Sequence, residues 1–459
     1  MSPYDVLILG GGITGAGILR DCALRGLKAC LIEKGDPAQG TTANSSHLIH
    51  GGLRYLLYDR LTTHATSWDS GHIVRIARPL LTRLPILWPV YSWHTHGLET
   101  IHTLMKAYSP FQKMKYGLPP LRLTCEETLR LVPGLTAENL KGGLVFDEWV
   151  INPTLLVRQN LEAASQMGAE VLTRTETEES LIQSGRLEGM RVKKESGESV
   201  EIKAKLTVNA TGPWVNAVAR NWGLFIPLKL RKGTHLVYDV SALRSQFSDS
   251  PVGMLLEAAD QERYIFIIPA GEKILVGPTD IPCHENPDRL RPDPDEIRYL
   301  IQSTQKYLKL PEDFQNTLCG ARPIIDKTGN EKLLSREYEI FDHEALEGLK
   351  GAITIAGGKM SSYRMMAEDL VDLLCRKLGK SASCTTYRKT LPGEEIRDIP
   401  QVSLPNPLLK NFLMNHPRLR EIHALAYLGA GFVKHILTRT FTQEPPPPDL
   451  WQYYHDLKR

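Results

Sequence analysis

The chain has 459 residues, of which 42% are hydrophobic and 23% are charged, so it can form several globular domains and is not a disordered chain. Lysine and arginine number 55 against 52 acidic residues, and the net charge of +3 is too small to indicate nucleic-acid binding. No apolar run reaches the roughly 20 residues of a membrane-spanning helix. The seven cysteines are scattered without a CxxC pair, which favours reduced thiols over a metal site. We expect a protein of the cytoplasmic side, with peripheral membrane attachment left open.

The N-terminal end of the chain predicts one strand–helix–strand unit. Residues 4–9 (YDVLIL) predict a strand, three glycines break it, and residues 13–25 predict a helix. Residues 28–32 (KACLI) predict a second strand, which Glu33 closes. A strand followed by a glycine turn and a helix is the setting in which a dinucleotide site is expected.

The glycines of that turn have the GxGxxG spacing, at Gly10, Gly12 and Gly15. Glycine permits a tight turn and a close approach of the backbone to a pyrophosphate, which the N-terminus of the helix then binds through its N–H groups. Glu33 is positioned to accept hydrogen bonds from ribose hydroxyls. These features predict dinucleotide binding but do not choose between FAD and NAD.

Residues 56–116 predict mostly helices interrupted by prolines. The apolar stretch from Pro79 to Tyr91 is bordered by arginines and lysines. It is interpreted either as a buried helix pair or as a segment that dips into a membrane interface. Residues 152–167 predict an amphipathic helix, and residues 170–173, 189–193 and 199–202 predict strands.

The middle of the chain, residues 225–345, alternates short strands with turn residues. The clearest strands are predicted at 236–240, 264–268 and 273–276, which indicates a mainly antiparallel sheet. Residues 352–356 then predict a buried strand, Gly357–Gly358 a break, and residues 361–378 a long helix. This late unit would let the chain return to the first domain.

Seven short segments follow one another in an order that resembles the FAD-dependent glycerol-3-phosphate dehydrogenases, which belong to the D-amino-acid-oxidase-like flavoprotein superfamily. They are GTTANSSHLIHGGLRYL (40–56), NATGPWV (209–215), KGTH (232–235), TD (279–280), GARP (320–323), SREY (335–338) and GGKMSSYR (357–364). The resemblance covers about residues 4–395.

The resemblance implies an α/β plus α+β fold, in which a mainly antiparallel substrate domain is inserted into a discontinuous, Rossmann-like FAD-binding domain. FAD-binding parts are expected at residues 1–80, 151–222 and 346–395. A helical segment, membrane-facing in one interpretation, is expected at 81–150, where the substrate domain starts, and the antiparallel sheet at 223–345. A short helical C-terminal region is expected at 396–459.

The resemblance also implies which residues hold FAD. In addition to the glycine turn, it assigns flavin contacts to two loops, the adenine to the backbone at Val171, and the adenosine and pyrophosphate to the NATGPW turn. The alternatives to these cofactor roles are that Ser45 and Ser46 only hydrogen-bond to solvent in their loop, and that Trp214 only packs against its neighbours. The expected cofactor residues are Gly10, Gly12, Ile13, Thr14, Gly15, Glu33, Lys34, Ser45, Ser46, His50, Gly51, Gly52, Leu53, Val171, Ala210, Gly212, Trp214, Gly358, Lys359, Met360 and Ser361.

The implied substrate is sn-glycerol 3-phosphate, whose phosphate dianion suits guanidinium groups and a lysine. The expected substrate-binding residues are Arg54, Tyr55, His235, Arg322, Arg336 and Lys359, of which His235, Arg322 and Lys359 are the expected catalytic residues. His235 is either the base that takes the hydroxyl proton or a neutral hydrogen-bonding group. Asp280 either orders a loop or acts on the substrate.

The function expected from the resemblance is oxidation of glycerol 3-phosphate to dihydroxyacetone phosphate, with hydride transfer to FAD. Electrons would pass to a quinone, and the enzyme would be peripheral on the cytoplasmic side of the membrane. The alternatives are an oxidase that uses oxygen, a related FAD-dependent oxidoreductase that acts on a hydroxy acid or amine, and a flavin-binding protein without turnover. A homodimer is left open.

Overall fold

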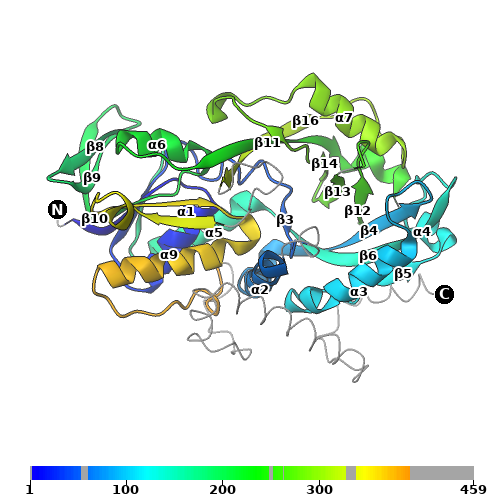
Figure 1. Ribbon diagram of the computed structural model, residues 1–459, viewed down its shortest axis with the longest axis horizontal. Coiled ribbons are helices and arrows are strands. Elements are labelled where there is room, and N and C mark those ends of the chain that lie inside the picture. Colours follow the sequence, from blue (N-terminus) through cyan, green and yellow to red (C-terminus); the bar gives the residue numbers. More distant parts are fainter. Residues whose placement is uncertain (1–2, 53–59, 248–251, 262, 327–337, 393–459) are drawn as a thin grey trace.

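Two β-sheets with helices packed on them make up the computed structural model, which describes residues 3–52, 60–247, 252–261, 263–326 and 338–392 (Figure 1). Within these residues one sheet has eight strands and the other has ten. The chain alternates between the two sheets: strands within residues 4–32, 170–209 and 338–357 belong to the first sheet, and strands within residues 48–151 and 228–325 belong to the second. This arrangement confirms the predicted fold class. The helical region expected at 396–459 lies outside the described residues.

The central strands of the first sheet are parallel. β10 (Ser199–Asn209) and β2 (Ala29–Ile32) flank β1 (Tyr4–Leu9), while β18 (Ala352–Gly357) pairs with β10 and β7 (Glu170–Leu172) pairs with β2. β1 is buried except at its first residue, as expected for a parallel strand covered on both faces. Because parallel strands end at the same edge of a sheet, the loops that follow β1, β2, β10 and β18 meet there.

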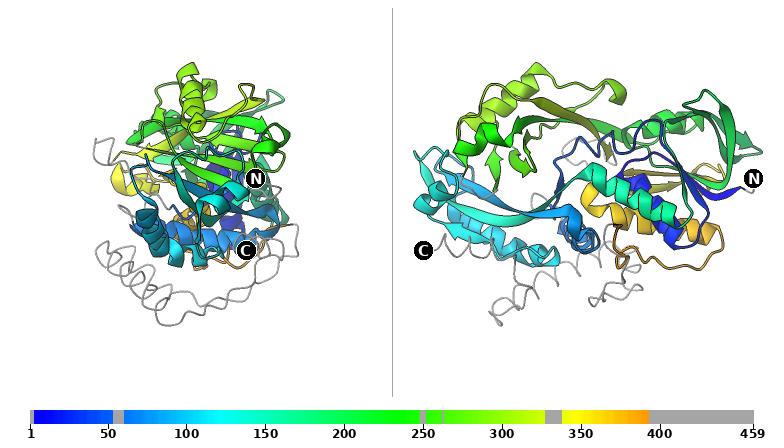
Figure 2. Two further views of the ribbon diagram at one scale, coloured as in Figure 1. Left: turned by 90° about the vertical axis from the view of Figure 1, so that its right-hand side faces the viewer. Right: turned by 180° about the vertical axis from the view of Figure 1, so that it is seen from behind.

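Three helices pack together on one face of this sheet: α1 (Ile13–Leu24), α5 (Pro153–Gln166) and α9 (Tyr363–Lys377) (Figures 1 and 2). Gly17 allows α1 and α9 to approach, because a Cβ there would lie 2.8 Å from the ring of Tyr363. The three helices confirm the helical predictions for residues 13–25, 152–167 and 361–378. The sheet is completed by β8 (Thr175–Gln183), β9 (Arg186–Lys194) and β17 (Tyr338–Asp342), with α6 (Val215–Asn221) and α8 (His343–Leu346) beside it.

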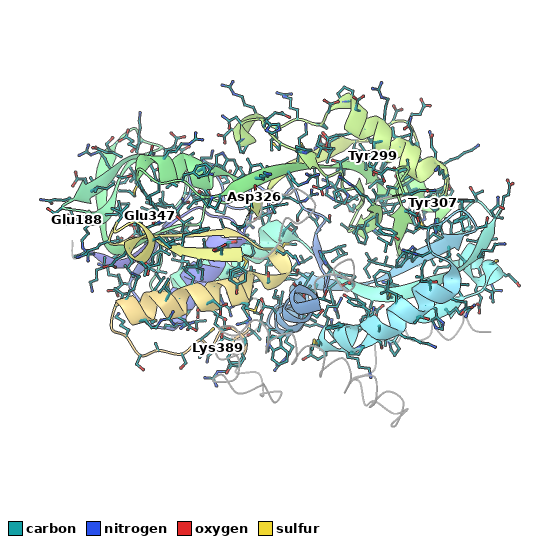
Figure 3. The ribbon with its side chains drawn as sticks, in the orientation of Figure 1. Glu188, Tyr299, Tyr307, Asp326, Glu347 and Lys389 are labelled. Atoms are coloured by element: carbon teal, nitrogen blue, oxygen red, sulfur yellow. The ribbon has the colours of Figure 1, made fainter. Side chains whose placement is uncertain are left out.

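The second sheet is mainly antiparallel, as predicted. The strands expected at 236–240, 264–268 and 273–276 correspond to β11 (Leu228–Asp239), which ends one residue earlier than expected, β13 (Tyr264–Ala270) and β14 (Lys273–Gly277). α7 (Pro294–Gln305), which carries Tyr299, packs against β11 and β12 (Figure 3). The strands of this sheet are β3 (Leu48–Ile49), β4 (Leu81–Tyr91), β5 (Leu121–Leu123), β6 (Leu140–Ile151), β11 (Leu228–Asp239), β12 (Gly253–Glu257), β13 (Tyr264–Ala270), β14 (Lys273–Gly277), β15 (Ile281–Pro282) and β16 (Asn316–Ile325).

The prediction of helix for the apolar stretch is wrong over Leu81–Tyr91, which is strand β4, and residues 140–151 of the supposedly helical segment form β6. β4 pairs with β6 along its whole length and with β12 only at Ile86 and Leu87. Leu87 packs into one core while its neighbours Ile86 and Trp88 pack into the other. A strand buried on both faces shows no polar–apolar alternation, which is why its period was not visible. Because eight consecutive residues of β4 are buried, the strand presents no apolar face to a membrane interface.

The helical prediction does hold around that strand, for α2 (Arg60–Ile76), α3 (Leu98–Met114) and the short α4 (Cys125–Leu131). α3 packs against α2 and β6. None of the helices in the described ranges is long and apolar enough to span a lipid bilayer.

Candidate active site

The glycine turn between β1 and α1 has the close packing that requires glycine. Gly10 has a φ of +107°, and a Cβ on it would lie 2.7 Å from the carbonyl oxygen of Ala210. A Cβ on Gly15 would overlap the carbonyl oxygen of Gly10. Gly12 is different, because the nearest atom to its Cβ position is Thr42 Oγ1 at 3.4 Å. Gly10 and Gly15 therefore serve the fold, whereas Gly12 leaves open the space where a ligand can approach.

The N-terminus of α1 is available to an anion. Gly12, at the N-cap, has no side chain with which to cap the helix, and the first turn (ITGA) contains no acidic residue. The N–H of Ile13 donates to Thr42 Oγ1 at 3.2 Å. Uncapped N–H groups and the positive end of the helix dipole favour a phosphate group at this position, beside Ile13 and Thr14.

Glu33, at the end of β2, faces the glycine turn. Its Oε2 accepts a hydrogen bond from the N–H of Gly11 at 2.6 Å, and its Oε1 accepts one from the N–H of Gly35 at 2.9 Å. An ionised carboxylate has about four acceptor positions, so two bonds leave it able to accept hydroxyl groups as well. Glu33 is thus aimed at the edge of the sheet that the sequence predicts for ribose.

Lys34 and Trp214, both predicted cofactor residues, contact one another. Lys34 is exposed, pairs with Asp288 and lies 4.4 Å from the centre of the Trp214 ring. Trp214 also packs over Gly40, where a Cβ would lie 2.9 Å from the ring. The buried Nε1 of Trp214 has no hydrogen-bond partner among the described residues.

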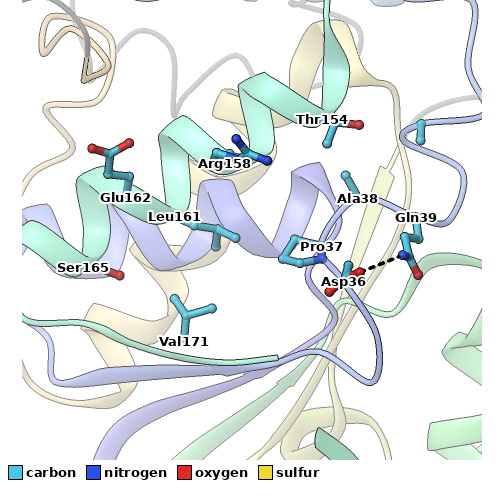
Figure 4. A pocket seen from close by; sticks show the side chains of 11 residues that line it. Asp36, Pro37, Ala38, Gln39, Thr154, Arg158, Leu161, Glu162, Ser165 and Val171 are labelled. Atoms are coloured by element: carbon cyan, nitrogen blue, oxygen red, sulfur yellow. Dashed lines mark hydrogen bonds between the residues drawn. The ribbon is translucent and has the colours of Figure 1, made fainter. Parts of the chain in front are cut away.

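A cavity of about 730 Å³ opens beside Val171 (Figure 4). Its walls come from the loop after β2, including Asp36 and Pro37, and from α5, including Arg158 and Leu161. It therefore lies next to the strand predicted to hold the adenine end of the cofactor. Residues expected to bind substrate, such as His235 and Arg322, do not line it.

Helix α2 brings together two predicted flavin-side loops that are far apart in the sequence. The buried Ser70 Oγ lies 3.4 Å from the carbonyl oxygens of both His50 and Ser361. One turn earlier, Ser67 Oγ donates to the carbonyl of Gly51 at 3.4 Å, and Thr63 Oγ1 does the same for Gly52. Sequence reasoning missed this support, because α2 carries no motif.

The second flavin-side loop, from Gly358 to Ser361, leads into the 3₁₀ turn Met360–Ser362. Gly358 has a φ of +82°, and half-buried Lys359 precedes the turn. The buried Oγ of Ser361 has no hydrogen-bond partner among the described residues. The loop starts where β18 ends, at the same edge of the sheet as the glycine turn.

His235, on β11, is brought beside the predicted flavin loop. Its Nε2 lies 2.9 Å from the Oγ of Ser46, and Ser45 Oγ donates to the carbonyl of Thr42. The ring is buried, and its Nδ1 has no hydrogen-bond partner in the described part of the chain. Burial, assisted by the positive charge of Arg322, lowers the pKa of His235 to about 3. His235 is therefore neutral near pH 7, and because so low a pKa makes it a weak proton acceptor, the hydrogen-bonding role is favoured over that of a base.

Arg322, on β16, lies across the same face of the sheet. Its Nη1 pairs with Asp280 Oδ1 at 3.2 Å, and its Nη2 donates to the carbonyl of Thr279 at 3.1 Å. The guanidinium covers Gly233, where a Cβ would lie 2.6 Å from its Cζ. Only glycine leaves room for the guanidinium at this position.

Two further arginines, which sequence reasoning missed, share Asp280. Arg231 stands opposite Arg322 in the strand register; its Nε pairs with Asp280 Oδ1 at 2.7 Å and its Nη2 donates to the Asp280 carbonyl. Arg263 donates to that carbonyl as well. Asp280 therefore orders the arginines around it. The detectable signal for Arg231 was its period-two spacing with Gly233 and His235 on one face of the strand.

Four predicted residues, Leu53, Arg54, Tyr55 and Arg336, lie outside the described residues. The others occupy two facing surfaces. Predicted cofactor residues lie at the loop edge of the first sheet and in the segment around β3, whereas the face of β11 and β16 carries His235 and Arg322. The bond of Ser46 to His235 and the bond of Thr41 to the carbonyl of Ala321 join the two surfaces.

A family model described as FAD dependent oxidoreductase matches residues 5–365. The chain belongs to this family. The oxidoreductase is 35% identical over 419 residues to the aerobic glycerol-3-phosphate dehydrogenase of Staphylococcus aureus (strain USA300), which covers 86% of this chain and 72% of that protein. Its fold matches the FAD complex of the glycerol-3-phosphate dehydrogenase from Bacillus halodurans with a TM-score of 0.67 at 27% identity, covering 95% of this chain and 77% of that one.

The L-alpha-glycerophosphate oxidase from Mycoplasma pneumoniae with FAD bound has the same fold, with a TM-score of 0.61 at 17% identity over 86% of this chain and all of that one. These comparisons confirm the predicted resemblance, and FAD as the cofactor of this oxidoreductase.

The residues described here fit FAD. The open space at Gly12 and the uncapped α1 suit a pyrophosphate. Three buried polar atoms, Trp214 Nε1, His235 Nδ1 and Ser361 Oγ, have no hydrogen-bond partner among the described residues. Because a buried polar group without a partner is costly, such atoms at predicted cofactor and substrate positions indicate a ligand that supplies the partner.

Proposed function

We propose that this FAD-dependent oxidoreductase oxidises sn-glycerol 3-phosphate to dihydroxyacetone phosphate. The observation that carries the proposal is the group of three arginines around Asp280: Arg231 and Arg322 pair with its carboxylate, and Arg263 donates to its main-chain carbonyl. Arg231 and Arg322 lie on the same sheet face as His235, and guanidinium groups at this place suit a phosphate dianion. The names of the relatives point to the same substrate.

In this proposal, bound FAD would supply the acceptor for the hydride that leaves C2 of the substrate. Arg322 and Lys359 bind the phosphate, and Arg54, Tyr55 and Arg336 remain substrate-binding residues on the resemblance alone. Orientation of the substrate is the main contribution of the chain, because holding two reacting groups in place removes much of the entropic cost of their meeting.

His235 is proposed to orient rather than to ionise. Because its pKa is about 3, the ring does not carry protons on both nitrogens at the same time near pH 7. It stays a neutral imidazole bonded to Ser46. Its second nitrogen, Nδ1, is then available to the C2 hydroxyl or to the flavin ring. A neutral imidazole is a poor acceptor of a full proton when its pKa lies that low.

We further propose that the electrons pass to a quinone, and that the enzyme works at the cytoplasmic face of the membrane in which a quinone is dissolved.

Anaerobic addition of glycerol 3-phosphate should bleach the flavin absorption at about 450 nm, and a soluble quinone analogue should restore it. Glycerol, which lacks the phosphate, is the matched control. Absence of bleaching would refute the substrate. Rapid peroxide formation in air, with no response to the quinone analogue, would show that oxygen and not a quinone accepts the electrons.

A further inference from the structure

Behind Arg322 lies a buried polar chain that the proposed function does not use. Thr279, which is 2% exposed, accepts a hydrogen bond on Oγ1 from the N–H of Thr234 at 2.8 Å and donates from the same oxygen to Glu296 Oε1 at 2.5 Å. The N–H of Thr279 donates in turn to the carbonyl of Thr234 at 3.0 Å. The segment around Thr279 is therefore fixed to β11 by two bonds and to α7 by a third.

Glu296 is the centre of this chain. It lies in the first turn of α7, is 4% exposed, and its two oxygens accept four hydrogen bonds or ion pairs from three elements. Oε1 accepts from the hydroxyls of Thr234 and Thr279, and Oε2 accepts from the N–H of Asp293 at 3.0 Å and pairs with Lys232 at 3.1 Å. A buried carboxylate with this number of donors is fully paired, which makes it a fixed point in the fold.

The chain ends on the guanidinium of Arg322. Side chains of Lys232 and Thr234 point to one face of β11, and those of Arg231 and His235 point to the other, where the candidate site lies. Thr279 joins the two faces, because its hydroxyl bonds to Glu296 while its carbonyl accepts from Arg322 Nη2 at 3.1 Å. The next residue, Asp280, supplies the second partner of the same guanidinium.

We propose that Glu296 and Thr279 are positioning residues for Arg322, which hold the guanidinium at the place where it meets the anionic group of the substrate. The proposal rests on the proposed function for the identity of that group. Neither side chain touches the substrate. They act by fixing the carbonyl of Thr279 and the carboxylate of Asp280, so that Arg322 is oriented before the substrate arrives.

The test is Thr279→Val in the FAD-loaded enzyme, which keeps the volume and removes the hydroxyl. We expect KM for glycerol 3-phosphate to rise about 3- to 10-fold, a part of what full loss of a hydrogen bond to a charged group would cause, with kcat changed less than about 2-fold. The affinity for inorganic phosphate, titrated calorimetrically, should fall by a similar factor. Thr279→Ser, which keeps the hydroxyl, should restore both values.

Thr234→Val is the matched control. It removes another hydroxyl that donates to Glu296, at 2.9 Å, but leaves the bond between Thr279 and Glu296 in place. Its KM should stay within about 2-fold of the unmodified enzyme. An equal rise in both variants would mean that the network stabilises the domain in general, and it would overturn the proposal.

The effect must also pass through Arg322. In an Arg322→Ala background, Thr279→Val should cause no further change in KM or in phosphate affinity. The same rise in that background would refute the positioning role. Glu296→Gln, which keeps the volume and exchanges one acceptor oxygen for a donor, does not depend on how valine fits; an unchanged phosphate affinity in that variant would also refute the proposal.

Failure of the proposed function gives a different result. If the unmodified enzyme binds phosphate but glycerol 3-phosphate does not bleach its flavin, the substrate is wrong while the phosphate titrations still test the positioning role. If the unmodified enzyme bleaches with glycerol 3-phosphate and all variants bind phosphate equally, the function stands and the positioning role fails.

Discussion

Gly233→Ala should separate substrate binding from stability in this oxidoreductase. A Cβ at position 233 would overlap Nη2 of Arg322 and would lie 2.6 Å from Cζ and 2.9 Å from Nη1 of the same side chain. Ordinary contacts of a carbon are about 3.5–4.0 Å, so the guanidinium has to move by about 1.5–2 Å. The obstructed atoms are the far end of a flexible side chain, and the φ of Gly233 is not in the left-handed region, so alanine fits the strand itself.

The size of the effect follows from what the movement breaks. Arg322 loses its alignment with Asp280 and Thr279 and can no longer meet the phosphate from the same direction. A hydrogen bond to a charged group contributes about 1.5–3 kcal/mol, which corresponds to a rise in KM of about 10- to 150-fold. Stability should change little or increase slightly, because glycine inside a strand is weaker than alanine.

The assay compares steady-state kinetics of glycerol 3-phosphate oxidation with thermal unfolding of the same FAD-loaded preparations. We expect a KM increase of at least about 10-fold, a melting temperature within about 2 °C of the unmodified enzyme, and an unchanged flavin spectrum. An unchanged KM would show that Arg322 does not bind the substrate in the orientation described. Loss of FAD would show that the guanidinium serves the cofactor instead.

Two glycines of the turn after β1 should behave differently when replaced by alanine. The new Cβ in Gly15→Ala overlaps the Gly10 carbonyl and should lower the melting temperature of the FAD-free protein. Gly12→Ala should leave that melting temperature nearly unchanged but weaken FAD binding, measured as flavin released per chain. Equal effects of both variants on the FAD-free protein would contradict this division. His235 should make stability fall as the pH drops from about 6.5 towards 3, since its pKa of about 3 in the folded state lies below the ordinary 6.5 and the unfolded chain binds the extra proton. His235→Gln should therefore flatten the pH dependence of the urea midpoint between about pH 4 and 7, and an identical slope would disprove the buried, neutral imidazole.

The sequence predicted those parts of the fold in which a local signal and the tertiary structure agree. β1, α1 and β2 could be recognised because an apolar run, a glycine turn and a helical period follow one another, and each has the same meaning in the folded chain. β4 could not, because its side chains alternate between two apolar cores rather than between a core and solvent. Its prolines also pointed away from a strand, although both lie outside the short pairing with β12.

The candidate site divides in a similar way. Gly10 and Glu33 could be predicted from the strand–turn–helix pattern, and the loops that follow β10 and β18 from the family resemblance; the structure brings all of them to one edge of the first sheet. The register of β11 with β16, which sets Arg231 opposite Arg322, is a long-range property and left no local trace. The ionisation of His235 was equally undetermined, since the burial and the neighbouring positive charge that lower its pKa come from other segments of the chain.

The residues that hold the site residues in place lie on elements without a sequence motif, for a physical reason. The carbonyls of His50 and Gly51 need only a hydroxyl nearby, which Ser70 and Ser67 supply, and either serine or threonine on α2 would meet that need. Glu296 fulfils the corresponding role behind Arg322 from a helix cap, where an acidic residue has an ordinary structural explanation in the capping box. Residues that touch a ligand are specified by the chemistry of the ligand, whereas residues that hold them are specified only by geometry. The positioning residues can therefore be found only after the fold has brought them to the site.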